Sequence, residues 1–263
     1  MLTTCRRALF ALVLLLPIAA HAQSYPSRPI KLVVPYAPGG GADAVARIVA
    51  RKMGEQIGQS IVIENKGGAG SIVGTDLVAK AEPDGYTLLV ISSSFVTSVA
   101  VYPKLPFDYK KDFTAVAQFA SGPANLLVVS AAFPGNTLKE LLELAKNRDK
   151  PVTYGSPGIG SVQHFVAEMF NMSAGVKLSH IPYKGLSPAH IDVVGGQISM
   201  LFDSPMAALP RAKEGRVRVL ATTAAKRWHG APEIPTMAES GMPGYEVNSW
   251  HALFAPAGTP KDI

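Results

Sequence analysis

Ile30–Gly54 (IKLVVPYAPGGGADAVARIVARKMG) is the stretch that decides the fold. Ile30–Tyr36 has the apolar, β-branched composition of a buried strand, and Ala42–Gly54 follows with the periodicity of an amphipathic helix. The helical spacing predicts an inward stripe of Val45, Ile48, Val49 and Met53. Three glycines separate the two elements, so the segment predicts a strand, a glycine loop and a helix in that order.

The same alternation continues outward from this segment. Ser60–Glu64 and Tyr86–Ile91 have the pattern of further strands, and Ile72–Ala81 has that of the helix between them. Strands that alternate with helices are typical of a parallel sheet. After one more strand at Phe113–Phe119, Ser121-Gly122-Pro123 is a plausible crossing point between two lobes.

A second unit repeats this local pattern. Leu126–Val129 predicts a strand, Thr137–Glu140 is a capping box at the start of a helix, and Gly155–Gly160 is a second glycine loop before a helix that begins at Ser161. The predicted fold is therefore a two-lobed α/β fold, with mainly parallel sheets flanked by helices and a ligand cleft between the lobes. We expect residues 23–123 in the first lobe and 124–247 in the second, with 248–263 returning to the first.

The N-terminus has the features of a secretory signal. Arg6 and Arg7 precede the apolar run Ala8–Ile18, and Ala20-His21-Ala22 is a small-x-small cleavage site. This pattern predicts that residues 1–22 are a signal peptide cleaved near Ala22. Cys5, the single cysteine, is removed with it, which excludes thiol catalysis and cysteine-ligated metals in the mature chain.

Composition excludes other classes of protein. The chain has 25 Lys and Arg against 19 Asp and Glu, a net charge of +6, of which two charges belong to the signal arginines. Its densest basic cluster consists of Arg211, Lys213, Arg216 and Arg218. The cluster lacks the interleaved aromatic residues that nucleic-acid-binding surfaces use, so no nucleic-acid partner is expected. The mature histidines show no metal-ligand spacing, and we predict neither a metal nor a cofactor.

The first glycine loop is the strongest candidate for a binding site. The start of a helix that follows a parallel strand presents free N–H groups and partial positive charge, which favour anions. The glycines allow a ligand to approach these donors closely. Asp43 is interpreted as the helix N-cap. The candidate residues of this loop are Tyr36, Pro38, Gly39, Gly40, Gly41, Ala42 and Asp43.

Further candidates follow other predicted strands. Ser92, Ser93, Ser94 and Ser156 lie in strand-end loops as hydrogen-bonding hydroxyls, with Gly158 beside the last of them. For three positions two roles remain open. His164 either touches a ligand or braces the second glycine loop, and Asp203 either caps the next helix or accepts a donor from the ligand. Lys184 either supplies a cation to the ligand or is simply exposed, and Tyr183 beside it is a candidate to line the ligand site.

Two enzyme classes remain as alternatives. Gly39, Gly41 and Ala44 also match the G-x-G-x-x-A pattern of dinucleotide-binding folds, with Glu64 at the position of the ribose-binding acid. An exported hydrolase would require an activated serine, and the chain has no G-x-S-x-G motif.

Six ordered motifs carry a resemblance over nearly the whole mature chain. The chain resembles the Bug family of periplasmic solute-binding receptors of tripartite tricarboxylate transporters. The motifs are Val34–Asp43 (VPYAPGGGAD), Glu64–Gly70 (ENKGGAG), Pro83–Leu89 (PDGYTLL), Tyr154–Gly158 (YGSPG), Pro182–Gly185 (PYKG) and Ala255–Pro260 (APAGTP).

The resemblance implies a binding protein rather than an enzyme. It implies periplasmic location, a small carboxylate held in the cleft largely by loop amides and water, and delivery to a membrane permease; we expect a monomer. The chain departs from the family pattern at Phe95–Val99, where many members have His-Ala-x-Asn-Pro. Thr259-Pro260 is predicted to begin a helix, and because family members continue further, we expect the chain to be incomplete at its C-terminus.

Overall fold

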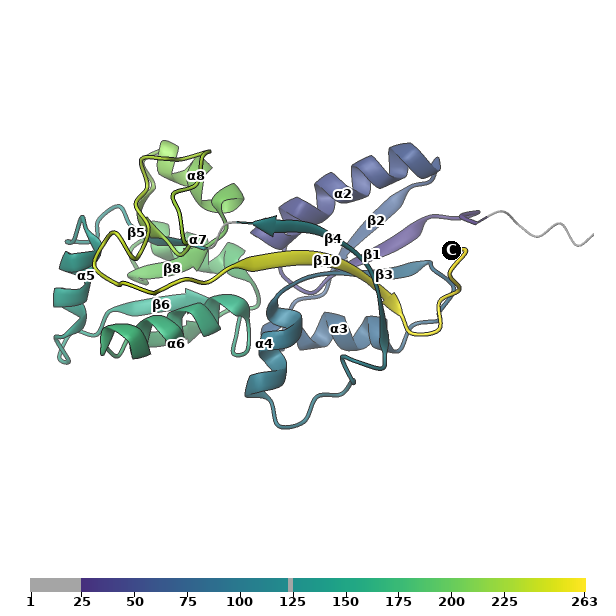
Figure 1. Cartoon of the computed structure of the whole chain (residues 1–263), viewed down its shortest axis with the longest axis horizontal. Coiled ribbons are helices and arrows are strands. Elements are labelled where there is room, and N and C mark those ends of the chain that lie inside the picture. The colour runs from purple at the N-terminus through teal and green to yellow at the C-terminus, as the bar shows by residue number, and fades with distance from the viewer. Residues whose placement is uncertain (1–24, 123–124) are drawn as a thin grey trace, which may run out of the picture.

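The computed structural model describes residues 25–122 and 125–263 and contains two sheets, each of five strands. Figure 1 shows them as two lobes, each with helices on both faces of its sheet. This arrangement confirms the predicted two-lobed α/β fold. The predicted signal peptide and the proposed division between residues 123 and 124 lie outside the described residues. In the part described, no helix is long and apolar enough to cross a membrane.

The first lobe contains the N-terminal elements and the last strand. Its sheet has the order β2-β1-β3-β10-β4, formed by Ile61–Asn65, Ile30–Val34, Thr87–Ser92, Ser249–Pro256 and Phe113–Gly122. Helix α2 covers one face, and α3 and α4 lie on the other (Figure 1). Their bounds, with those of the 3-10 turn η1, are Gly41–Ile57, Ile72–Ala79, Ser94–Val101 and Ala69–Ser71.

The second lobe is built in a similar way. Its sheet has the order β7-β6-β8-β5-β9, formed by Ser179–Pro182, Thr153–Ser156, Met200–Asp203, Leu126–Ser130 and Val217–Thr222. Successive side chains of β5 alternate between two apolar cores, with Leu127 and Val129 in one and Leu126 and Val128 in the other. Helices flank these cores: α5 (Leu138–Ala145), α6 (Val162–Ala174), α7 (Leu186–Val194) and α8 (Pro205–Lys213).

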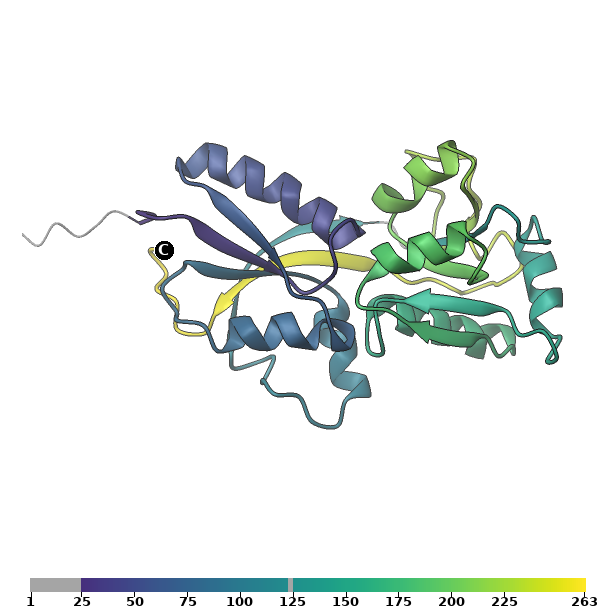
Figure 2. The same cartoon turned by 180° about the vertical axis from the view of Figure 1, so that it is seen from behind.

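The expectation of mainly parallel sheets holds for only half of the strand pairings. β1 pairs in parallel with β2 and β3, and β6 with β7 and β8, as the alternation of strands and helices predicts. The other pairings are antiparallel and involve β10 in the first lobe and β5 in the second. Both views show β10 entering the first-lobe sheet from the side of the second lobe (Figure 1, Figure 2). The strands that directly follow a connection between the lobes, β5 and β10, are therefore antiparallel to the strands they pair with.

The structure corrects two local predictions and contains two helices that the sequence analysis missed. Helix α2 buries Ala46 and Ala50, whereas Ile48 is 47% exposed, because its small residues and not its branched ones pack against the sheet. Helices α4 and α7 were not predicted, since α4 is rich in β-branched residues that favour strands. No helix begins at Thr259; its hydroxyl donates to the Pro256 carbonyl in a turn.

Candidate functional site

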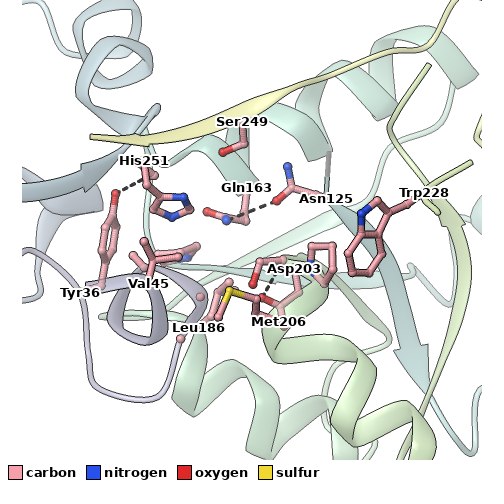
Figure 3. Close-up of a pocket in the computed structure, with 17 residues that line it drawn as sticks. Tyr36, Val45, Asn125, Gln163, Leu186, Asp203, Met206, Trp228, Ser249 and His251 are labelled. Carbon is pink, nitrogen blue, oxygen red and sulfur yellow. Dashed lines mark hydrogen bonds between the residues drawn. The ribbon is translucent and has the colours of Figure 1, made fainter. Parts of the chain in front are cut away.

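A cavity of about 180 Å³ lies between the two lobes. The first lobe contributes residues from the first glycine loop, the start of α2, the end of β3 and β10. The second lobe contributes the starts of β5 and α8, together with Gln163 and Trp228. Figure 3 shows Tyr36 at one end of the cavity and Trp228 at the other. The cavity therefore depends on both lobes.

The start of α2 forms part of the wall. Gly40 is the N-cap, in an extended conformation, and no side chain caps the helix. The first N–H groups of a helix have no partner within it and carry partial positive charge. Gly41 and Ala42 both line the cavity, so the positive end of α2 faces the place where a ligand would lie.

The start of α8 lies close to that of α2. Its N-cap, Ser204, also makes no capping side-chain bond. A Cβ placed on Gly41 would overlap the Ser204 hydroxyl and lie 2.8 Å from the Ser204 Cβ. Glycine at position 41 is therefore required for the two helix starts to approach in this arrangement.

Asp43 supports the glycine loop from behind and is not the N-cap. Its carboxylate accepts hydrogen bonds from the Gly39 N–H at 3.0 Å, from the Asn65 amide at 2.9 Å and from Arg47 at 2.9 Å. Burial would raise the pKa of Asp43, but the bonds from Arg47, Gly39 and Asn65 outweigh it and hold that pKa below its ordinary value. The carboxylate is thus a fixed anion that orders the loop, and it does not line the cavity.

A chain of hydroxyl groups runs from the cavity to the second lobe. Tyr36 Oη lies 2.8 Å from Ser92 Oγ, which donates to Ser94 Oγ at 3.0 Å. Ser94 Oγ then accepts from the backbone N–H of Val162 at 3.0 Å. Burial raises the pKa of Tyr36 above its ordinary value, so its hydroxyl stays protonated. Ser93 lies outside this chain, 3.2 Å from Ser249 Oγ within the first lobe.

Asp203 brings a buried carboxylate to the other wall. Its Oδ2 lies 2.5 Å from His190 Nε2, and its Oδ1 accepts from the Ser204 N–H at 2.7 Å. Three buried polar atoms nearby have no hydrogen-bond partner among the described residues: Asn125 Nδ2, Ser204 Oγ and His190 Nδ1. Asn125 and Ser204 both line the cavity, so two unpartnered polar groups are available to a bound molecule.

The second glycine loop reaches the cavity through Pro157, and its other residues lie behind that wall. Ser156 is fully buried, and its hydroxyl lies 2.7 Å from His180 Nε2. The His164 and His180 rings lie 4.5 Å apart, and burial together with the neighbouring His164 lowers the pKa of His180 to about 4. Gly158 packs against Gly70 of the first lobe, where an added Cβ would lie 2.9 Å from the Gly70 nitrogen. Gly158 therefore lies at the interlobe contact, whereas Ser156 and His164 contact residues of the second lobe.

The remaining predicted residues lie outside the cavity. The Tyr183 hydroxyl donates to Asp192 at 2.6 Å. The Lys184 side chain is exposed, and its carbonyl accepts from the Ala37 N–H of the first lobe at 3.2 Å. Pro38 and Gly39 are exposed at the loop's outer edge.

Six of the predicted residues line the cavity: Tyr36, Gly40, Gly41, Ala42, Ser92 and Asp203. Sequence reasoning did not single out the rest of the lining: Val45, Asn125, Pro157, Gln163, Leu186, Ser204, Pro205, Met206, Trp228, Ser249 and His251. Most of these are ordinary apolar or amide residues, for which no motif existed. Two had a local signal: Pro157 lies within the second glycine loop, and Ser204 immediately follows a strand-end aspartate.

Comparison with known proteins identifies the family. The profile of the family described as "Tripartite tricarboxylate transporter family receptor" matches residues 45–263. The chain belongs to this receptor family. A UPF0065 protein from the tcbD-tcbE intergenic region of a Pseudomonas species is 41% identical over 246 residues, which cover 93% of this chain and 73% of that protein.

Solved structures of similar receptors have the same fold. The periplasmic binding protein BugD is 38% identical with a TM-score of 0.87, over 90% of this chain and 79% of BugD. The R. palustris protein Rpa4515, whose structure contains adipate, is 36% identical with a TM-score of 0.86, over 90% of this chain and 80% of that one. These similarities confirm the resemblance to the Bug receptors.

The family consists of solute-binding receptors and not of enzymes, which confirms the prediction of a protein without catalysis. The geometry also argues against the two enzyme alternatives. Ser156 is buried and cannot attack a substrate in the cavity. Glu64, which a dinucleotide site would need for the ribose, is paired with Lys31 at 3.1 Å and with Lys66 at 3.0 Å.

Proposed function

We propose that this receptor captures a small carboxylate in the interlobe cavity and delivers it to the membrane permease of a tripartite tricarboxylate transporter. The ligand class comprises mono-, di- and tricarboxylates, with amino acids as a further possibility. One observation carries the proposal: the uncapped start of α2 opens into a cavity that also contains the unpartnered amide of Asn125. A carboxylate would satisfy both.

Two further observations support this reading. The hydroxyl groups of Tyr36, Ser92 and Ser94 are bound to one another and to a backbone N–H, so none of these three is an activated nucleophile. The related Rpa4515 protein was solved with adipate, a carboxylate.

We further propose that ligand binding works by closure of two lobes. The lobes would be residues 23–123 with 248–263, and residues 124–247, with hinges near Pro123 and Gly244–Ser249. Contacts between Ala37 and Lys184 and between Ser94 and Val162 would hold the closed form, which the permease would recognise. A monomer exported to the periplasm by its signal peptide fits this role.

A thermal-shift screen tests the binding class. The purified protein is heated with carboxylates, amino acids, nucleotides and esters, each at 1 mM or above. A micromolar ligand at about 100 times its Kd stabilises the folded state by roughly 2.7 kcal/mol, which is readily measured as a rise in Tm. We expect this rise with a carboxylate. Stabilisation by nucleotides alone, or turnover of an ester, would contradict the proposal.

A further inference from the structure

The ring of His251 projects into the cavity from the first lobe. Ser249 and His251 both line the cavity, whereas Trp250 between them packs against the first-lobe core, as the alternation of side chains along a strand requires. The pairing of β10 with β4 shifts register directly after His251, and a bulge of this kind redirects a side chain. Figure 3 shows the ring between Tyr36 and Gln163. The strand therefore presents an imidazole to a molecule bound in the cavity.

This imidazole is neutral and has no partner of its own. Burial is the one cause that lowers the pKa of His251, to about 4, and no hydrogen bond or charged side chain of the described residues contributes. At pH 7 the ring of the free receptor is therefore uncharged, with one nitrogen as a donor and the other as an acceptor. Burying a polar ring without a partner costs free energy, which a ligand that bonds to the ring would recover.

His251 is the one side chain in the described lining of the cavity that can become a cation. The lining contains three titratable side chains among the described residues: Tyr36, Asp203 and His251. Burial keeps the Tyr36 hydroxyl protonated, and the Asp203 carboxylate is bound to His190 and to a backbone N–H. A formal positive charge can therefore reach a ligand from the lining only through His251.

The elements packed around His251 add no further charge to its surroundings. β3 and β4, which flank β10 in the sheet, contain no titratable residue. On α2, Asp43 pairs with Arg47 behind the glycine loop, and on α6 the His164 ring lies against His180 within the second lobe. The protonation of His251 should therefore respond mainly to the contents of the cavity.

A carboxylate in the cavity would favour the protonated ring. Gly41 and Ala42, at the start of α2, line the first-lobe side of the same cavity of about 180 Å³, so a carboxylate held there comes close to His251. An opposite charge within about 4 to 6 Å stabilises the charged form of a titratable group and works against the effect of burial. Binding an anion should thus raise the pKa of His251 from its low starting value.

We propose that His251 binds the ligand carboxylate as an imidazolium, taking up one proton from solvent as the ligand enters the cavity. The ring then donates a hydrogen bond to a carboxylate oxygen, and no bond of the ligand breaks. This inference rests on the proposed carboxylate-binding function and deepens it, because it makes the affinity depend on pH. The complex holds more protons than the free receptor, so binding strengthens as the pH falls.

Isothermal titration calorimetry measures the linked proton. Acetate, benzoate, succinate, adipate, malate and citrate are titrated first, and the tightest binder is used at pH 7.5, 6.5 and 5.5 in pairs of buffers that differ in ionisation enthalpy. If the ligand restores the pKa of His251 to its ordinary value of 6.5, about half a proton is taken up at pH 6.5. The Kd, corrected for protonation of the ligand itself, then falls about tenfold between pH 7.5 and 5.5.

The possible failures of the two proposals are distinct. Saturable binding without proton uptake, and with a corrected Kd that does not change with pH, would overturn the inference and leave the proposed function intact. If the folded protein binds none of these acids or any other carboxylate, the proposed function fails and the inference fails with it.

Three variants assign the proton to one ring. His251→Gln keeps a donor and an acceptor but cannot be protonated, so proton uptake should vanish and the Kd at pH 5.5 should exceed that of the wild type about tenfold. His251→Phe also removes the hydrogen bond and should bind more weakly than His251→Gln at pH 7.5. His164→Gln is the matched control, because this half-buried ring does not line the cavity, and it should keep the wild-type uptake.

Proton uptake that persists in folded His251→Gln would assign the proton to another group, such as the pair of Asp203 and His190, and would contradict the inference. The Tm of each variant without ligand shows whether it is folded.

Discussion

Ser94 Oγ, at the start of α4 in the first lobe, accepts a hydrogen bond of 3.0 Å from the N–H of Val162, the first residue of α6 in the second lobe. The same hydroxyl accepts from Ser92, which in turn contacts Tyr36 in the cavity wall. The ligand cavity and the interlobe contact are thus joined through three side chains.

Ser94→Ala removes the acceptor that joins the lobes. If closure assists binding, losing this bond of about 1 kcal/mol should raise the Kd of the ligand roughly fivefold and leave the unfolding of each lobe almost unchanged. Thr75→Val is the matched control, because the Thr75 hydroxyl donates to the Ser71 carbonyl within the first lobe and does not line the cavity. Calorimetry on both variants makes the comparison, and equal losses of affinity would argue against the interlobe role.

Gly41 and Gly40 should respond differently to the same change. A Cβ on Gly41 would overlap the Ser204 hydroxyl, whereas a Cβ on Gly40 meets only the Leu186 Cβ at 3.9 Å, an ordinary contact. Gly41→Ala is therefore expected to weaken binding more than about tenfold, and Gly40→Ala less than about threefold. Titrating both variants with the same carboxylate measures their Kd values. Unchanged affinity in Gly41→Ala would show that the starts of α2 and α8 need not approach each other for binding.

Asp43→Ala should destabilise the protein more than the loss of a helix cap. Its carboxylate is buried and accepts from Gly39, Asn65 and Arg47, so we expect a loss of roughly 2 to 3 kcal/mol in the free energy of unfolding and a weaker ligand affinity as the loop loosens. Arg47→Ala removes only the exposed partner and should cost less than about 1 kcal/mol. Urea denaturation measures the free energy of unfolding of both variants. Similar losses would show that Asp43 contributes only its ion pair with Arg47.

Two partly buried histidines make stability depend on pH. Burial lowers the pKa of His251 and of His180 to about 4, below the ordinary value of 6.5. Between these values the unfolded chain binds protons that the folded chain does not, so the free energy of unfolding falls as pH decreases from about 7 to 4. His251→Asn should flatten this fall by roughly 2 kcal/mol. His229→Asn, at an exposed position, serves as the control, and identical pH profiles would contradict the burial effect.

The sequence predicted those features that are encoded locally. The strand, glycine loop and helix around Gly41 follow from composition and period. Thr137 caps α5 as predicted, with the Glu140 N–H donating to its hydroxyl at 3.2 Å, but the Glu140 carboxylate accepts from the Asn136 N–H and not from that of Thr137. Asp43 was predicted to be the N-cap, which is wrong: it lies in the first turn, and its role depends on Asn65 from another strand. Such a contact has no local signature.

The cavity-lining residues of the second lobe could not be predicted either, because they too are brought together by contacts between distant elements. Met206 and Trp228 reach the cavity only because α8 and the segment after β9 fold back beside α2. His251 lies on β10, whose antiparallel entry between β3 and β4 depends on the crossing between lobes. Residue type alone does not distinguish these side chains from ordinary core residues.

Reversible binding without conversion is the central claim, and equilibrium dialysis with an isotopically labelled carboxylate tests it most directly. The account predicts one equivalent bound at a Kd of about 1 μM, roughly −8 kcal/mol, with all of the label recovered as the starting acid after the protein is denatured. Steady formation of a product by pure protein, or no saturable binding of any carboxylate, would contradict it.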